Sequence, residues 1–197
     1  MKNLELAKEF LNSSPNGLIT SAQLTALGIH RSVLQELVKS GEVYRYARGL
    51  YVKSSAFEDD FYLLQCKYSR GIYSHDTALY LLGYSDRAPS KYTMTFPKGY
   101  NSPSLNQELL IVKRVISENY ELGLTAIKSP SGNPICIYDL ERTLCDVVRG
   151  QGCDIQIVNQ AFKSYAVFKH KNIHKLFKFA EQLRVKPKIL RYMEILL

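Results

Sequence analysis

An arginine, a glutamine and a lysine follow one another at intervals of four residues in one short stretch of this sequence. Arg31, Gln35 and Lys39 fall on one stripe if residues 30–39 form a helix, and Ser32 stands beside its start. Arg and Gln side chains form paired hydrogen bonds with the edges of guanine and adenine in the major groove of DNA. The spacing therefore predicts a helix that contacts bases through Arg31, Ser32 and Gln35 and a phosphate through Lys39.

A basic hairpin is predicted directly after this helix. Residues 43–46 and 50–53 are β-type runs on either side of Ala47-Arg48-Gly49, which places Arg48 at the tip and Arg45 close by. An arginine in such a hairpin can lie along a phosphate or enter the minor groove. Three tyrosines lie along the same ribbon: Tyr44, Tyr46 and Tyr51.

A shorter helix is predicted before the basic stripe. Thr20 and Gln23 form a capping box that starts it at Ser21, and Gly28 ends it in the left-handed conformation. The second helix is predicted to bury Leu34, Leu37, Val38 and Gly41. Helix, glycine turn, basic helix and basic hairpin in this order are typical of a winged helix-turn-helix. A helix pair that only packs, with a solvated hairpin, is the alternative.

Charge is distributed unevenly along the 197 residues, which carry a formal net charge of +8. Residues 1–53 have a net charge of +3, residues 54–154 of −2 and residues 155–197 of +7. Two basic ends therefore flank a mildly acidic middle, which indicates an anionic partner, either DNA or an acidic protein. A hydrophobic content of 46% is enough for packed cores, so a disordered chain is excluded.

Two domains are predicted, with a boundary at the small polar residues 54–56. Residues 1–55 form the winged helix-turn-helix, and residues 56–197 form an α+β domain with a small sheet and a helical C-terminus. The expected strands cover 91–96, 109–116 and 124–127, and the expected helices of the tail cover 155–168, 172–183 and 187–196. Without a run of transmembrane length or a disulfide framework among its four cysteines, the chain is expected to be cytoplasmic, with no membrane partner.

Features of an enzyme are not apparent in the sequence, so we expect no catalytic residue, no cofactor and no metal. A phosphate-binding glycine loop, a Cys-x-x-Cys pair and a nucleophile beside an orienting base are all missing. His170 and His174 are one turn apart on a predicted helix, but lysines surround them and disfavour a divalent ion. In the polar stretch 138–146, Arg142 and Asp146 are four residues apart, which predicts a structural ion pair.

Several motifs together resemble a known family, the AbiEi-type antitoxins. The motifs Gly17-Leu18-Ile19-Thr20, Gly28-Ile29-His30-Arg31-Ser32 and Arg48-Gly49-Leu50-Tyr51-Val52 are similar to its N-terminal winged helix. The motifs Tyr73-Ser74-His75 and Tyr138-Asp139-Leu140-Glu141-Arg142-Thr143 are similar to its second domain. The resemblance covers nearly the whole chain.

This resemblance implies an antitoxin of an abortive-infection, phage-defence system that also represses its own operon through inverted repeats in the promoter. Its functional partner would be a nucleotidyltransferase-like toxin, countered in the type IV manner, without a stable complex. Under this interpretation Lys171, Lys175 and Lys178 are the candidates for antitoxicity, because they lie in the largest unexplained charge excess.

Two alternatives remain open at this stage. One is a winged-helix transcription regulator whose second domain senses a ligand, which an apolar pocket in that domain would favour. The other is a nuclease or nucleotide-modifying enzyme tethered to DNA, which clustered carboxylates holding a metal would favour.

Overall fold

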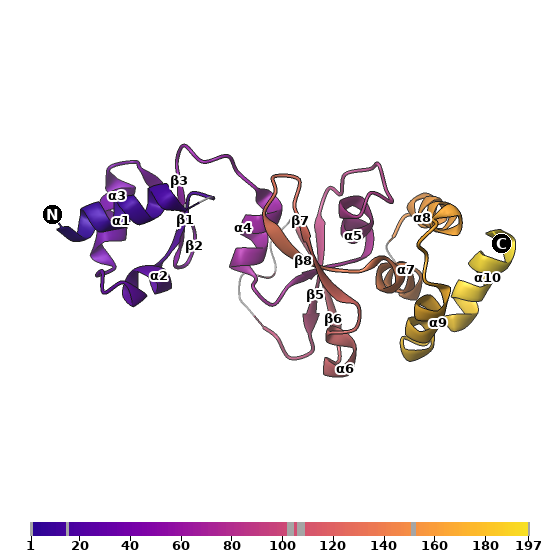
Figure 1. Ribbon diagram of the computed structural model, residues 1–197. Helices are drawn as coiled ribbons and strands as arrows, with labels where there is room; N and C mark the ends of the chain where they lie inside the picture. The colour runs from indigo at the N-terminus through magenta and orange to yellow at the C-terminus, as the bar shows by residue number, and fades with distance from the viewer. Residues whose placement is uncertain (1, 15, 102–104, 106–108, 151–152, 197) are drawn as a thin grey trace. The chain divides into compact units, whose positions relative to one another are not determined.

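The computed structural model describes residues 2–14, 16–101, 105, 109–150 and 153–196. The chain divides into two compact units, Met1–Ser69 and Arg70–Leu197, each described by itself (Figure 1). Helices and small sheets are combined in both, so the predicted α+β class is confirmed. Within the described residues, no helix has both the length and the apolar character needed to cross a membrane.

The N-terminal unit combines four helices with one small sheet. Its elements are α1 (Lys2–Ser13), β1 (Leu18–Thr20), α2 (Ser21–Ala26), α3 (Ser32–Lys39), β2 (Val43–Ala47), β3 (Leu50–Lys53) and α4 (Asp60–Lys67). The strands are antiparallel in the order β1-β3-β2, with Leu18 opposite Val52 and Arg45 opposite Tyr51. The predicted hairpin is thus present, and β1 adds a third strand that the sequence analysis did not anticipate.

This sheet separates two apolar clusters because successive side chains of a strand point to opposite faces. On one face, Ile19 packs with buried residues of α1, α2 and α3. On the other face, Leu18, Leu50 and Val52 pack with Leu63 of α4. The sheet is therefore packed against α1, α2 and α3 on one face and against α4 on the other.

Helix α4 belongs to the N-terminal unit, which ends at Ser69. Residues 54–56, where we predicted the domain boundary, therefore lie inside this unit. The physical reason is the contact of Leu63 with Leu50 and Val52, which joins α4 to the far side of the sheet. Local composition at residues 54–56 carries no information about this distant contact.

The capping box that was predicted before α2 is confirmed. The Thr20 hydroxyl accepts a hydrogen bond from the Gln23 backbone N–H, and the Gln23 side chain accepts one from the Thr20 N–H. Helix α3 begins at Ser32, two residues later than expected. It buries Val33, Leu34 and Leu37, whereas Val38, predicted to be buried, is 39% exposed.

The C-terminal unit holds a five-stranded mixed sheet and helices at its end. Its strands are β4 (Ile72–Tyr73), β5 (Tyr92–Pro97), β6 (Leu110–Val115), β7 (Leu124–Lys128) and β8 (Pro134–Tyr138). They run in the order β6-β5-β4-β8-β7, with parallel pairs β4–β8 and β5–β6. Its helices are α5 (His75–Leu81), α6 (Ser117–Tyr120), α7 (Leu140–Arg149), α8 (Ile155–Val167), α9 (Ile173–Gln182) and α10 (Lys186–Leu196). All three helices predicted for the tail are present.

Helix α7 lies at the centre of the C-terminal unit, in contact with α5, α8, α9 and α10 (Figure 1). Every residue of it from Leu140 to Val148 is buried. Asp139 caps its start by accepting a hydrogen bond from the Arg142 N–H. The charged side chains of this helix therefore need partners inside the protein.

The Arg142 side chain finds these partners. Its Nε lies 3.0 Å from Asp146 Oδ2, as the predicted ion pair requires, and its Nη1 donates to the carbonyl groups of Asn119 and Leu122 at 2.6 and 2.8 Å. The guanidinium also lies 4.1 Å from the centre of the Tyr138 ring. These contacts fasten α7 to the segment between β6 and β7.

The histidine pair that was considered as a metal site is not on one helix. His174 belongs to α9, but His170 lies in the turn before it, where its ring packs edge-on against Phe168. The two histidines are therefore not one turn apart on a helix, because the turn at residues 169–170 separates α8 from α9.

We predict that Arg142→Met lowers the free energy of unfolding of the C-terminal unit by about 3–5 kcal/mol, since it leaves Asp146 buried without its partner. Burial already raises the pKa of Asp146 to about 6 against the pull of Arg142, and loss of the guanidinium raises it further. A carboxyl group whose pKa is raised by folding loses stability as pH rises through that pKa. Urea unfolding should therefore show a larger deficit at pH 8 than at pH 5.

The matched control is Arg87→Met, which removes the ion pair with Asp154 at 3.1 Å. Because the Arg87 side chain is 73% exposed, its loss should cost less than about 1 kcal/mol at both pH values. Equal losses for the two variants would mean that the Arg142 contacts do not hold the unit together.

Candidate nucleic-acid interface

A groove of about 710 Å³ opens between α2, α3 and the β2–β3 hairpin of the N-terminal unit. Its lining residues are Thr20, Ser21, Ala22, Arg31, Leu34, Gln35, Arg45, Arg48, Gly49 and Tyr51. Three arginines and no carboxylate line it, which makes its surface electropositive. An electropositive groove beside an exposed helix is suited to a polyanion.

The structure brings four of the six predicted DNA-binding residues to this groove: Arg31, Gln35, Arg45 and Arg48. Ser32 and Lys39 lie on α3 outside the lining, and all six side chains belong to exposed residues. Helix and hairpin, predicted separately from the sequence, therefore contribute to one surface.

The start of α3 lacks a side-chain cap, since Arg31 occupies the N-cap position without a capping hydrogen bond. His30 Nδ1 lies 2.9 Å from the Ser32 hydroxyl and accepts a longer hydrogen bond from the Ser32 N–H. Ser32 is thus engaged by its neighbour, whereas Arg31 and Gln35 present their side chains to the groove.

Ser21 fixes the hairpin tip to the start of α2. Its backbone N–H donates to the Gly49 carbonyl at 2.9 Å, and its hydroxyl donates to the same oxygen at 3.2 Å. Gly49 has a φ of +76°, a region that favours glycine. Ser21 was not predicted to be a residue of the site. The signal that could have found it is its position directly after the N-cap Thr20, at the end of α2 that faces the groove.

The three tyrosines of the hairpin do not share one face. Tyr51 lies opposite Arg45 and lines the groove, whereas Tyr44 and Tyr46 pack on the other side with the Leu50 and Val52 cluster. The Tyr44 hydroxyl donates to Glu58 at 2.8 Å, and burial together with Glu58 raises the pKa of Tyr44 to about 12. Strand alternation therefore places Tyr51 beside the groove, where it also packs on the cluster of α1, α2 and α3, and places the other two tyrosines on the opposite face.

The lysines proposed for antitoxicity have different environments in the C-terminal unit. Lys175 Nζ lies 2.9 Å from Asp139 and 3.7 Å from Glu141, so this side chain ties α9 to the start of α7. Lys171 Nζ donates to the carbonyl of Ala166 at 2.8 Å, and Lys178 is exposed. Lys175 therefore has a structural contact that its sequence neighbours did not reveal.

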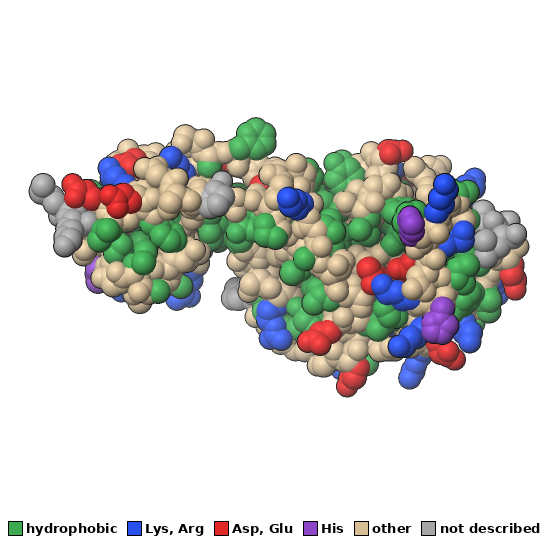
Figure 2. Space-filling model, in the orientation of Figure 1, with side chains coloured by type: hydrophobic (Ala, Val, Ile, Leu, Met, Phe, Trp, Pro, Cys, Tyr) green, Lys and Arg blue, Asp and Glu red, His purple; other side chains and the backbone are tan. Residues whose placement is uncertain are grey.

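Basic side chains form a surface around these lysines. On the face seen in Figure 2, Lys and Arg side chains gather with histidines over the C-terminal helices. Lys169, Lys178 and Arg184 are among the exposed cations of this region.

The two motifs that resemble the second domain of the family, which begin at Tyr73 and Tyr138, lie on neighbouring strands of the sheet. Tyr73 of β4 pairs in parallel with Ile137 of β8, and each strand leads into a buried helix. Ser74, at the N-cap position of α5, has its hydroxyl 2.8 Å from that of Thr95 and makes no capping bond. Burial, together with the positive charges of Lys113 and other cations, lowers the pKa of His75 to about 3.

An imidazole with so low a pKa is a weak general base at neutral pH. Among the residues that the structure describes, no three histidine, cysteine, aspartate or glutamate side chains group as a metal site would require. Tyr73 and Tyr138 are completely buried, so both motifs contribute side chains to the core of this unit.

Comparisons with known proteins agree with the expectation for the first unit. Residues 5–52 match the model of a family described as a transcriptional regulator, AbiEi antitoxin, which confirms the resemblance predicted from the winged-helix motifs. The match does not extend to the motifs of the second unit. No curated protein matches the chain.

Among solved structures, the chain is similar to the crystal structure of the RV2827C protein from Mycobacterium tuberculosis. The TM-score is 0.54 at 13% sequence identity, and the alignment covers 96% of this chain and 79% of that one. At this identity the likeness concerns the fold alone.

We predict that Gly49→Ala destabilises the N-terminal unit more than Gly41→Ala does. Both glycines have positive φ values, of +76° and +75°, so both substitutions carry similar backbone strain. A Cβ at position 49 would lie 2.8 Å from the Ser21 hydroxyl oxygen, whereas a Cβ at position 41 meets nothing within 4 Å. Thermal unfolding of the two variants isolates the contact that holds the hairpin tip.

Part of the loss at position 49 should be recovered in the double variant Gly49→Ala/Ser21→Gly, which removes the crowding hydroxyl. Identical midpoints for the two single variants would show that Ser21 does not hold the hairpin.

Proposed function

From the match of residues 5–52 to the AbiEi antitoxin family of transcriptional regulators, we propose that this protein binds duplex DNA through the groove of its N-terminal unit. The observation that carries the proposal is the convergence of Arg31, Gln35, Arg45 and Arg48 on one surface without a carboxylate. A packing-only helix pair has no need for such a concentration of uncompensated charge.

Each element has a distinct role in this proposal. Helix α3, with eight residues, is about 12 Å long, and an α-helix with its side chains has a diameter of about 10–12 Å, which fits the width of the major groove. Arg31, at the N-cap position, and Gln35, in the first half of the helix, contact base edges, with Ser32 beside them. Arg45 and Arg48 of the hairpin, and Lys39 at the end of α3, contact phosphates or the minor groove.

The regulatory proposal follows the family resemblance. The protein binds inverted repeats in its own promoter and represses the operon, with one copy on each repeat, because a palindromic site presents two equivalent half-sites. In the same cell it counters a nucleotidyltransferase-like toxin of a phage-defence system, without a stable complex. The exposed cations of the C-terminal helices are the surface proposed for this second role.

Arg48→Ala and Arg31→Ala should affect DNA binding in different ways. Loss of the phosphate contact at Arg48 should weaken binding to all sequences and reduce the slope of log affinity against log salt by about one. Loss of the base contact at Arg31 should relax specificity at one base pair by about 1–3 kcal/mol. Fluorescence anisotropy with an operator duplex and a scrambled duplex, over a range of salt concentrations, separates the two effects.

Lys8→Gln is the matched control, since it removes one positive charge of the same unit outside the groove lining. It should leave both affinity and salt slope nearly unchanged. Unaltered operator binding by the double variant Arg45→Ala/Arg48→Ala would show that the hairpin does not contact DNA.

Antitoxicity should depend on Lys178 and not on the DNA groove. In cells that co-express the toxin encoded beside this gene, Lys178→Glu should reduce growth rescue, because it reverses an exposed charge of the basic surface. Arg45→Ala/Arg48→Ala, expressed from an unrelated promoter, should rescue growth fully. Lys175→Glu is unsuitable for this test because it places a third carboxylate beside Asp139 and Glu141.

Lys163→Glu, an exposed reversal on α8, serves as the control for net charge. Thermal unfolding should give the same midpoint for the Lys163 and Lys178 variants within about 0.5 kcal/mol of stability. Full rescue by the folded Lys178 variant would place the antitoxic surface elsewhere.

A second candidate function, regulation by a small ligand, is supported by a specific feature of the C-terminal unit. A pocket opens between α7, α8 and α10, and its lining is partly apolar. This pocket shares no lining residue with the DNA groove of the N-terminal unit.

A further inference from the structure

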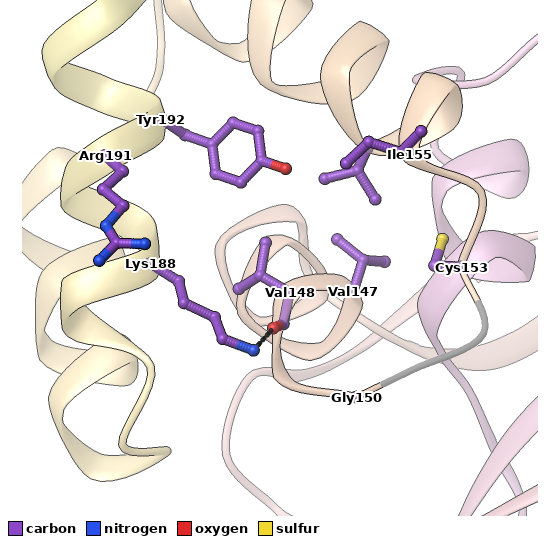
Figure 3. Close-up of a pocket in the computed structure, with 9 residues that line it drawn as sticks. Val147, Val148, Gly150, Cys153, Ile155, Lys188, Arg191 and Tyr192 are labelled. Carbon is purple, nitrogen blue, oxygen red and sulfur yellow. Dashed lines mark hydrogen bonds between the residues drawn. The ribbon is translucent and has the colours of Figure 1, made fainter.

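The pocket of the C-terminal unit has a volume of about 440 Å³, within the range of pockets that hold small molecules. It is lined by Val147, Val148, Gly150, Cys153, Ile155, Val158, Lys188, Arg191 and Tyr192. In Figure 3, the labelled residues of α10 stand on one side, Ile155 of α8 on the other, and the valines of α7 between them.

The floor of the pocket is apolar and built from the protein core. Val147, Val148 and Val158 are each less than 9% exposed and belong to the main apolar cluster of the unit. Ile155, at the wall, is 60% exposed, so it presents apolar surface at the mouth of the pocket. A ligand with an apolar body would cover Ile155 and rest on the valines.

The polar side of the pocket is cationic. Lys188 Nζ donates to the Val148 carbonyl at 2.7 Å, which leaves two of its protons for another acceptor (Figure 3). In the part of the chain that the structure describes, no carboxylate lies within ion-pair distance of Lys188 or Arg191. The two charges stand three residues apart on α10, on the same side of that helix.

Tyr192 completes the wall between the two regions. Its ring stacks on Phe162 with the ring centres 4.3 Å apart, and Figure 3 shows its hydroxyl directed across the pocket toward Ile155. A stacked ring is held in place, so the hydroxyl is available as a fixed hydrogen-bond donor.

The nearby acids do not compensate the cations. Asp154 pairs with Arg87 and accepts a hydrogen bond from the Gln156 N–H, and Asp76 accepts one from Thr93. Cys153 is uncharged at neutral pH, since burial and these acids raise its pKa to about 11. The pocket therefore combines an apolar floor with uncompensated positive charge at one side.

We propose that this pocket binds a small organic anion: a carboxylate or phosphate head held by Lys188 and Arg191, with an aliphatic or aromatic body over Val147, Val148 and Ile155. The site is separate from the DNA groove, which belongs to the other unit, and does not depend on DNA binding.

Isothermal titration of the full-length protein with three matched probes tests the site. Octanoate and octyl phosphate should bind saturably, whereas 1-octanol, which has the same body without the charge, should bind at least tenfold more weakly. Inorganic phosphate, a head without a body, should also bind at least tenfold more weakly. The comparison of octanoate with octyl phosphate identifies the preferred head. Equal binding of octanol or of inorganic phosphate, or no saturable binding of either anion, would overturn the proposal.

Two variants locate the binding in this pocket. Arg191→Gln and Ile155→Gln should each weaken octanoate binding by about tenfold, since both residues are exposed and their replacement does not disturb the core. Lys178→Gln removes an equal charge outside the pocket, and Val167→Gln removes an exposed aliphatic residue from the other end of α8. These two controls should bind octanoate as the parent protein does.

Alkylation of Cys153 supplies a second measurement, independent of the heat of binding that the titration records. Octanoate should slow the labelling of Cys153 but not that of the exposed Cys136, as measured by peptide mass spectrometry. Octanoate binding that survives both pocket variants, or labelling of Cys153 that octanoate does not change, would show that the pocket is not the site.

Discussion

One buried guanidinium organises the C-terminal unit. Arg142 is completely inaccessible to solvent, and it joins Asp146, two carbonyl groups of the segment after β6, and the face of Tyr138. A charge in such a place is tolerated only where its partners are already positioned, so the sheet and the central helix must form together. Gly123 contributes by its lack of a side chain, since a Cβ there would lie 2.6 Å from Arg142 Cβ. The helices α8 to α10, and with them the anion pocket, are then assembled around α7.

The N-terminal unit depends on a different constraint, the alternation of side chains along three short strands. Alternation sends Leu18, Leu50 and Val52 toward α4 and turns Arg45 and Tyr51 toward α3. The basic surface is thus a consequence of strand register as well as of helix periodicity. A shift of one residue in β2 would move Arg45 to the face of Tyr44 and replace a cation in the groove by a phenol.

Features that depend on neighbouring residues could be predicted from the sequence. The capping box at Thr20, the start of α7 at Asp139 and the Arg142–Asp146 pair each involve residues within four positions. Features that depend on distant contacts could not be predicted. Strand β1 has only three residues and exists because it pairs with β3, and α4 joins the first unit through Leu63. Lys175 appeared to be a free cation because its partner Asp139 is far away in sequence. On α3, Leu34 and Leu37 are buried as predicted, but Val33 is buried in place of Val38.

The double hydrogen bond from Ser21 to the hairpin tip has a consequence for the cost of recognition. A hairpin that becomes ordered only on the nucleic acid would consume part of the binding free energy, because ordering a loop on binding costs free energy. Here Ser21 holds the carbonyl of Gly49, so the hairpin tip is joined to the start of α2 without a ligand. In the proposed complex with DNA, the groove between α2, α3 and the hairpin would therefore be preorganised. Discrimination between sequences then depends on whether the duplex can match the fixed spacing of helix and hairpin. In such a complex the DNA, and not the protein, would have to deform to fit, so sequences that deform at a lower free-energy cost would bind more tightly.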